Sequence, residues 1–244
     1  MRNEDQWRPT KYQNVNGRAT AGPAVGPGSR LAADLVARAY RSYIPRYASG
    51  TLADLGCGEV PLYGIYRTHV DNIVCVDWPS SKHQLSHVDV QCDLSEPLAL
   101  ASNSVETVVL SDVLEHVLDP AALWREMGRI VAPGGYVLVN VPFLYWLHEQ
   151  PHDYYRYTEY ALRHLAGATG FTVEHLEALG GSVEVGVDIL SKHLSVLPGF
   201  GPWLARIVQA AGSSWSKSAP GRSLIRHTGK RFPLSYFMLA RRNA

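Results

Sequence analysis

The stretch Leu52-Ala53-Asp54-Leu55-Gly56-Cys57-Gly58 decides how the rest of this sequence is interpreted. The apolar segment 51–55 predicts a short buried strand, and two glycines follow it almost directly. Gly56 and Gly58 allow the backbone to turn sharply and to approach a ligand with no side chain in the way. Two glycines alone are more often ordinary turn residues, so their interpretation depends on the residues that end the neighbouring strands.

Strands and helices are expected to alternate around this stretch. Further short apolar strands are predicted at 72–77, 88–94, 106–111, 135–142, 171–179 and 233–240. Helices are predicted after Ser29, ending at Pro45, after Asp119, ending at the 133–135 Pro-Gly-Gly cluster, and at about 158–168. Apolar strands separated by helices indicate an α/β fold, a doubly wound, Rossmann-like, mostly parallel seven-stranded sheet with helices on both faces. We expect the last strand at an edge of the sheet.

Four regions are expected along the 244 residues. They are an N-terminal arm and leading helix (1–48), a core (49–185), a helical cap (186–231) and the final strand (232–244). Residues 1–188 hold 14 Lys/Arg and 22 Asp/Glu, a net charge of −8, whereas 189–244 hold nine Lys/Arg and no acid. A basic end on an acidic body calls for a physical explanation.

The basic cap has several interpretations. We favour a lid over the acceptor site that packs on the domain with its charges solvated; an interfacial helix on anionic lipid is the alternative. Nucleic acid is not expected as a partner, because no basic run is interleaved with aromatic residues and the body is acidic. The sequence indicates no particular oligomeric state.

Acidic residues end three successive predicted strands. Asp77 follows Asp54 by 23 residues and can accept hydrogen bonds from ribose hydroxyls, and Asp93 can accept one from an adenine amino group. NAD is disfavoured, because Pro61 replaces the third glycine of its motif and Glu59 would lie beside the pyrophosphate. An acid there tolerates a cationic ligand without phosphate, such as S-adenosylmethionine.

With VCVDW (74–78), CDLSEPL (92–98) and the segment 111–142, the sequence resembles the class I S-adenosylmethionine-dependent methyltransferases of the type 11 group. The resemblance implies S-adenosylmethionine as cofactor. It also implies a set of cofactor-binding residues: Asp54, Gly56 and Gly58 at the methionine part, Asp77 at the ribose, Trp78 against the adenine, Asp93 and Leu94 at the adenine edge, and Ser111. Val60 stands where the family usually has a third glycine, which we expect to change the shape of the loop rather than the cofactor.

The methyl acceptor is expected at the loops after the fourth and fifth strands. Segment 142–158 holds six aromatic residues, two histidines and one arginine. His148 or His152 is a candidate general base, and Asp153 either orients an imidazole or caps a turn. His116 lies near the methyl group in the family, or bonds only the local backbone. No metal is expected, because Pro151 would break a helix carrying both loop histidines.

The sequence thus predicts an enzyme that transfers a methyl group to oxygen on a small molecule or glycan. A lipid-linked acceptor at a membrane surface, and a non-catalytic cofactor-binding or adaptor protein, are the alternatives. The polar N-terminus, the absence of an apolar segment long enough to span a bilayer, and three cysteines without CxxC spacing make the cytoplasm the expected location, with peripheral membrane contact as a variant.

Overall fold

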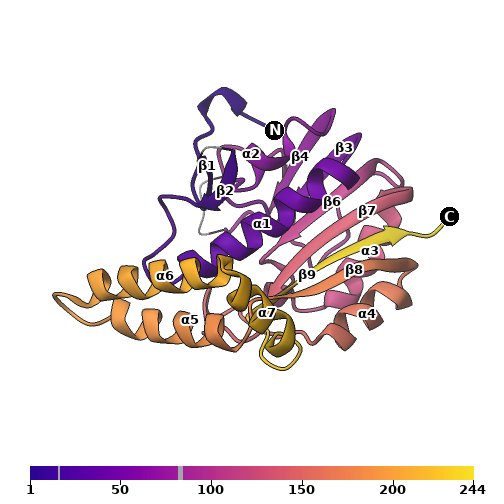
Figure 1. The fold of residues 1–244 in the computed structure, drawn as a ribbon. Helices are drawn as coiled ribbons and strands as arrows, with labels where there is room; N and C mark the ends of the chain where they lie inside the picture. The colour runs from indigo at the N-terminus through magenta and orange to yellow at the C-terminus, as the bar shows by residue number, and fades with distance from the viewer. Residues whose placement is uncertain (16, 82–84) are drawn as a thin grey trace.

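The computed structural model describes residues 1–15, 17–81 and 85–244. Its main sheet has seven strands in the order β5-β4-β3-β6-β7-β9-β8 (Figure 1). The strands are β3 (Thr51–Leu55), β4 (Asn72–Asp77), β5 (Val90–Gln91), β6 (Val105–Ser111), β7 (Val131–Pro142), β8 (Phe171–Leu179) and β9 (Ser235–Arg242). The strands from β3 to β7 pair in parallel, and β9 is antiparallel to both of its neighbours. The predicted mostly parallel α/β sheet is confirmed.

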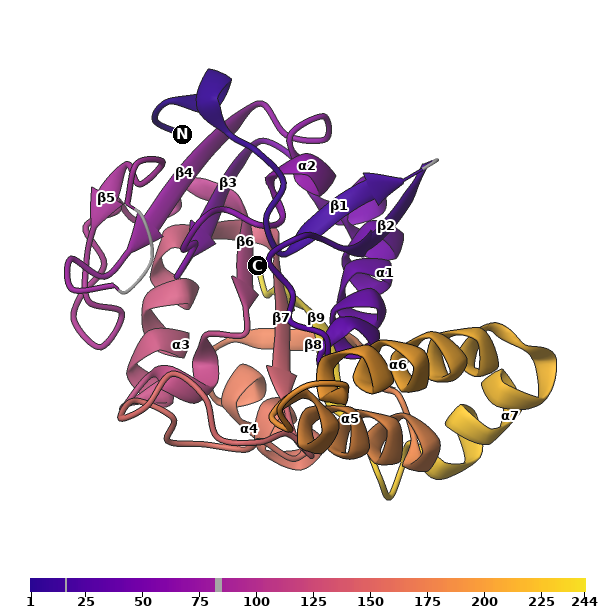
Figure 2. The ribbon, with the colours of Figure 1, turned by 90° about the vertical axis from the view of Figure 1, so that its left-hand side faces the viewer.

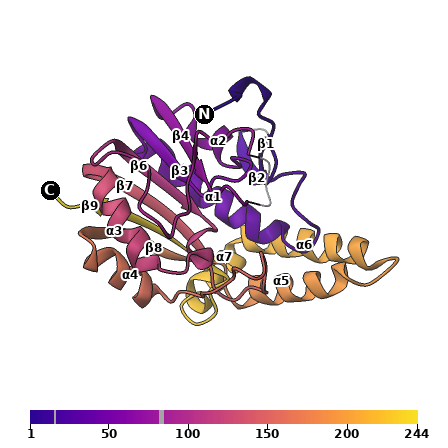
Figure 3. The ribbon, with the colours of Figure 1, turned by 180° about the vertical axis from the view of Figure 1, so that it is seen from behind.

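Helices cover both faces of this sheet, as Figures 2 and 3 show. They are α1 (Arg30–Tyr47), α2 (Tyr63–Tyr66), α3 (Pro120–Ile130), α4 (Glu159–Ala168), α5 (Ser182–Ser195), α6 (Gly201–Lys217) and α7 (Ala219–Thr228), with short 3₁₀ turns at Glu4–Gln6 and Leu114–His116. One apolar core lies between the sheet and α1, and a second between the sheet and α3 and α4. Because successive strand residues face opposite sides, each buried strand contributes to both cores.

Two predicted helix ends are wrong. Helix α1 continues through Pro45 to Tyr47, because a proline in the last turn removes only one backbone hydrogen bond. Helix α3 starts as predicted, with the backbone N–H of Ala122 donating to Asp119 Oδ1 at 2.9 Å. It ends at Ile130, before the Pro-Gly-Gly cluster, because Val131 already pairs with Val105 as the first residue of β7.

The position of β9 also differs from the prediction. This strand lies between β7 and β8 and is not at an edge. Residues 235–240 are all buried, so an apolar segment without polar alternation fits an interior position. The edge strand β8 is half-buried over most of its length. Strand β5 is shorter than predicted, since only Val90 and Gln91 pair with β4.

The N-terminal arm forms a hairpin that the sequence analysis did not predict. Strands β1 (Tyr12–Val15) and β2 (Arg18–Ala21) pair antiparallel and lie against α1 (Figure 2). Tyr12 and Ala21 are buried there, and the N–H of Ala21 donates to Asp34 Oδ1 at 2.7 Å. The arm is therefore part of the folded domain.

The segment before β9 is helical, as predicted for the cap. Helices α5 and α6 form an antiparallel hairpin that projects from the sheet, and α7 returns toward it (Figures 1 and 3). Gln209 holds this hairpin to the start of α1, accepting from Leu31 N at 2.6 Å and donating to Gly28 O at 3.0 Å. No helix in the described parts of the chain is long and apolar enough to cross a membrane. The division into four regions stays a prediction.

The loop after β3 depends on glycine at one position in particular. Gly56 has a φ of +69°, and a Cβ there would lie 2.6 Å from a methyl carbon of Val113. Val60 has a φ of +52°, so this valine adopts the left-handed conformation that glycine usually occupies. The backbone keeps that conformation because Val60 is fully buried and its carbonyl accepts a hydrogen bond from Trp7 Nε1 at 3.0 Å.

We predict that Gly56→Ala lowers the free energy of unfolding by about 2 kcal/mol or more, because it adds left-handed strain and a clash with Val113. The matched control is Gly167→Ala in α4, where an added Cβ meets no atom within 4 Å. That change should stabilise the protein by about 0.5–1 kcal/mol. Chemical denaturation of both variants measures this, and wild-type stability of Gly56→Ala would contradict the account of the loop.

Candidate functional site

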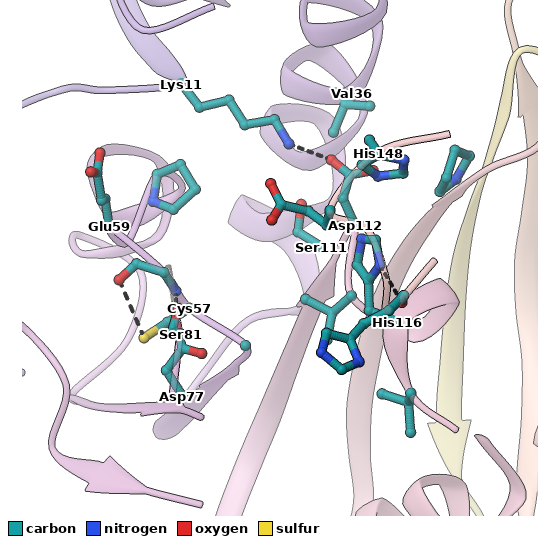
Figure 4. A pocket seen from close by; sticks show the side chains of 18 of the residues that line it. Lys11, Val36, Cys57, Glu59, Asp77, Ser81, Ser111, Asp112, His116 and His148 are labelled. Atoms are coloured by element: carbon teal, nitrogen blue, oxygen red, sulfur yellow. Dashed lines mark hydrogen bonds and ion pairs between the residues drawn. The ribbon is translucent and has the colours of Figure 1, made fainter. Parts of the chain in front are cut away.

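A cavity of about 940 Å³ lies at the carboxyl ends of the parallel strands. The chain runs outward from β3 to β4 and β5 on one side and to β6 and β7 on the other. In α/β sheets, this switch point is where ligands bind. The walls come from the loops after β3, β4, β6 and β7 and from the N-terminal arm (Figure 4).

Most of the predicted cofactor residues line this cavity. They are Gly56, Gly58, Asp77, Trp78, Asp93, Leu94 and Ser111. Asp54 is not among them, because its position in β3 turns it toward the core that contains Leu52 and Tyr66. Its Oδ2 accepts a hydrogen bond from the Tyr66 hydroxyl at 2.9 Å, and burial raises the pKa of Asp54 to about 7.

Asp77 joins the ends of two strands. Its Oδ2 accepts from Gly58 N at 2.6 Å and its Oδ1 from Trp78 N at 2.7 Å. Each carboxylate oxygen can accept more than one hydrogen bond. Trp78 is 38% exposed, and its indole meets the His152 ring edge-on at 5.3 Å.

Two buried hydroxyl groups of the cavity wall, Ser111 Oγ and Tyr12 Oη, form no hydrogen bond of normal geometry with the described residues. Buried polar groups nearly always have partners, so these two are suited to polar atoms of a bound molecule. Together with the glycine loop and the acid at the end of β4, they fit a polar nucleoside cofactor. Tyr12 was not predicted.

The N-terminal arm closes the cavity from above, as Figure 4 shows for Lys11. Lys11 Nζ lies 2.5 Å from Asp112 Oδ2, and Asn140 Nδ2 donates to Asp112 Oδ1 at 2.5 Å. Burial would lower the pKa of Lys11, but Asp112 outweighs it and the net pKa is raised, so the amine stays charged. Arg30 at the start of α1 donates to the carbonyls of Ala21 and Gly22 and so ties the arm to this helix.

The cap does not form the expected lid. Among the described residues that line the cavity, none comes from 182–231. Gln209 fixes α6 at the start of α1, and the hairpin projects away from there. Ser29, predicted to cap α1, makes no such bond; its Oγ lies 3.1 Å from the Tyr145 hydroxyl.

All three predicted histidines line the cavity. His148 Nδ1 lies 3.3 Å from Asp153 Oδ2, and His148 Nε2 lies 3.6 Å from Glu115 Oε1. His116 Nε2 lies 3.7 Å from the same Glu115 oxygen, and its Nδ1 lies 2.9 Å from His152 O. His152 is different, since it packs on Trp78, toward the predicted adenine side.

The two carboxylates beside His148 raise the pKa of its imidazole. Arg156 bonds both oxygens of Asp153, at 2.5 and 2.8 Å, and holds the pKa of that carboxyl well below its usual range. Glu115 is fully buried, which raises its pKa. Burial alone would lower the pKa of His148, but Glu115 and Asp153 outweigh it and raise the net pKa. The sequence analysis had assigned Glu115 no role.

The methyltransferase-domain family has a sequence model that matches residues 28–176. The chain belongs to this family. Over 152 residues it is 28% identical to probable S-adenosylmethionine-dependent methyltransferases from two strains of Mycobacterium tuberculosis, CDC 1551 and H37Rv. The match covers 55% of the chain and 55% of each relative, so the chain spans about half the length of these curated relatives. The cofactor of this methyltransferase-family chain is S-adenosylmethionine.

Solved structures share its fold. The cyclase SpnF has a TM-score of 0.58 and 16% identity, over 97% of this chain and 88% of that one. A putative methyltransferase in complex with the Haloferax volcanii activator Trm112 has a TM-score of 0.56 and 17% sequence identity, and the match covers 86% of this chain and 90% of that one. An S-adenosylmethionine-dependent methyltransferase from Mesorhizobium loti has a TM-score of 0.54 and 19% sequence identity, and the match covers 87% of this chain and all of that one. At these identities, the likeness concerns the fold alone.

Among the described residues, one group of side chains could hold a metal ion: the ligand atoms of Glu115, His116 and His148 lie within 4.8 Å of one another. It shares only His148 with the two loop histidines weighed from the sequence. The expectation that no metal takes part stays a prediction.

We predict that Asp77→Ala weakens S-adenosylmethionine binding by about 1.5–3 kcal/mol, because it removes charge-assisted bonds to the ribose. Asp71→Ala is the matched control, since Asp71 is exposed just before the opposite end of β4. Calorimetric titration measures both affinities, and a thermal melt checks that each variant folds. Unchanged affinity of Asp77→Ala would remove Asp77 from the cofactor site.

Proposed function

We propose that this chain transfers a methyl group from S-adenosylmethionine to a hydroxyl oxygen of a small molecule or glycan. The observation that carries the proposal is His148, held between two carboxylates in the same cavity as the glycine loop and Asp77. A volume of about 940 Å³ is near the upper end for small-molecule sites, which leaves room for an acceptor beside the cofactor.

The cofactor would lie along the near side of the cavity. Gly56 and Gly58 would face its methionine part, Asp77 its ribose, and Trp78 with Asp93 its adenine, as the family resemblance implies. When bound, S-adenosylmethionine supplies a methyl group on a positively charged sulfur. The hydroxyl groups of Ser111 and Tyr12 would bond polar atoms of the cofactor.

His148 would take the proton from the acceptor hydroxyl. A general base needs a basic nitrogen in the cavity and a group that stabilises its protonated form. Asp153 lies at Nδ1 and is itself fixed by Arg156, and Glu115 lies at the Nε2 side. This arrangement orients the imidazole and favours the imidazolium that forms, as in other base–carboxylate pairs. The covering arm would exclude water from the reacting atoms.

We predict that His148→Ala lowers turnover by about 10²–10⁴-fold and leaves cofactor affinity intact. The matched variant His152→Ala should affect cofactor affinity more than turnover, because His152 packs against Trp78. Release of S-adenosylhomocysteine with a panel of hydroxylated small molecules and glycans measures turnover, and calorimetry measures affinity. Full turnover of His148→Ala would assign proton removal to another group, with His116 the next candidate.

We predict that kcat/KM rises with pH through a pKa above the ordinary histidine value of about 6.5, because the base form of His148 is required. Glu115→Gln removes a negative charge beside the imidazole, so the pKa of His148 falls and the acid limb of the profile moves to lower pH. Asp153, Asp112 and the imidazole of His116 are the other titratable groups facing the ring. An acid limb at the same pH in Glu115→Gln would contradict the role of this pair.

A further inference from the structure

The tip of the α5–α6 hairpin exposes apolar side chains to solvent. This tip, residues 196–204, holds Phe200 at 81% exposure, Val196 at 69% and Trp203 at 59%, with Leu197 and Leu204 also exposed. Figures 1 and 3 show it as the part of the hairpin farthest from the sheet. A cluster of this kind at a protruding end is unusual for a surface that faces only water.

These side chains are not needed to pack the hairpin. The buried side of α6 consists of small and polar residues, namely Gly201, Ala205, Gln209, Gly212 and Ser216. At Gly212 an added Cβ would lie 2.7 Å from a methyl carbon of Val187, so α5 and α6 approach each other closely. The α5–α6 hairpin is therefore firmly packed, and its outward apolar residues have no partners in the described chain.

The exposed charge of the segment from α5 to α7 has one sign. Residues 182–232 contain only two acids, Glu184 and Asp188; both are buried, and they pair with Ser216 and Lys192. Of the exposed cations, Arg206 lies near the tip, whereas Lys217, Arg222, Arg226, Lys230 and Arg231 lie at the other end of α6 and on or just after α7. A second copy packed against the same surface would bring like charges together. An anionic surface complements both the charge and the apolar tip.

We propose that the tip of the α5–α6 hairpin docks this chain on an anionic lipid bilayer. Phe200 and Trp203 would enter the interfacial layer, where aromatic side chains are favoured, and Arg206 would meet the headgroups. The hairpin would lie at the surface without crossing it. Docking does not depend on methyl transfer and goes beyond it.

The hairpin is also in contact with the loop that carries His148. Lys192 of α5 lies with its Nζ 3.1 Å from the ring centre of Tyr145 and 5.1 Å from that of Trp146. Tyr145 lines the cavity, and Trp146 is exposed. The hairpin therefore touches the outer side of the loop that carries His148, although it does not line the cavity.

Vesicle flotation at low salt tests the docking. The full chain should float with vesicles of phosphatidylcholine and phosphatidylglycerol and much less with phosphatidylcholine alone. Phe200→Glu should lower the partition coefficient by about tenfold or more, because it replaces an aromatic side chain proposed to enter the interfacial layer with a charge. The matched control, Tyr160→Glu, changes an aromatic residue that is 75% exposed on α4 and should float like the wild type.

Two results would overturn the proposal: the wild type fails to float with the anionic vesicles, or Phe200→Glu floats as well as the wild type. If the wild type fails to float, light scattering then tests whether it forms a dimer that Phe200→Glu converts to a monomer. Such a conversion would assign the tip to a protein interface. Thermal melts and S-adenosylmethionine titration of Phe200→Glu should match the wild type, so a failure of docking is distinguishable from a failure of the cofactor site.

Discussion

The hydrogen bond from the backbone N–H of Gly58 to Asp77 Oδ2, 2.6 Å long, ties the ends of β3 and β4 together at the mouth of the cavity. The N–H groups of Gly56 and Cys57 donate to the carbonyl of Val76, at 2.8 and 3.1 Å, so the whole loop wraps over the end of β4. This arrangement requires a residue without Cβ at position 56, since Val113 of the next loop fills that space. The cofactor half of the site depends on this close fit.

The N-terminal arm completes the cavity, and its contacts differ in strength. The Lys11–Asp112 pair is short, but the lysine side chain is 39% exposed, so solvent screening keeps its contribution small. Trp7 packs on Tyr63, with ring centres 4.9 Å apart, and donates to the carbonyl of Val60. Apolar burial at Trp7 therefore holds the arm, and the ion pair positions its end over the ligand space.

The sequence predicted the features that are local. Strands β3 and β4 have the predicted bounds, because each is an apolar run that ends at a turn or an acid. The side-chain face of Asp54, the interior place of β9 and the contact of Lys11 with Asp112, 101 residues away, depend on tertiary packing that no local pattern encodes. The lid prediction failed for the same reason, since one buried glutamine, Gln209, directs the hairpin away from the cavity.

The central claim is that one cavity holds the methyl donor at Asp77 and the base at His148. A crystal structure of the full chain with S-adenosylhomocysteine tests it most directly, through the position of the ligand sulfur relative to the His148 ring. The account predicts ribose hydroxyls on Asp77 and the sulfur facing the His148 end of the cavity. A ligand bound outside this cavity, or one whose sulfur faces away from His148, would contradict it.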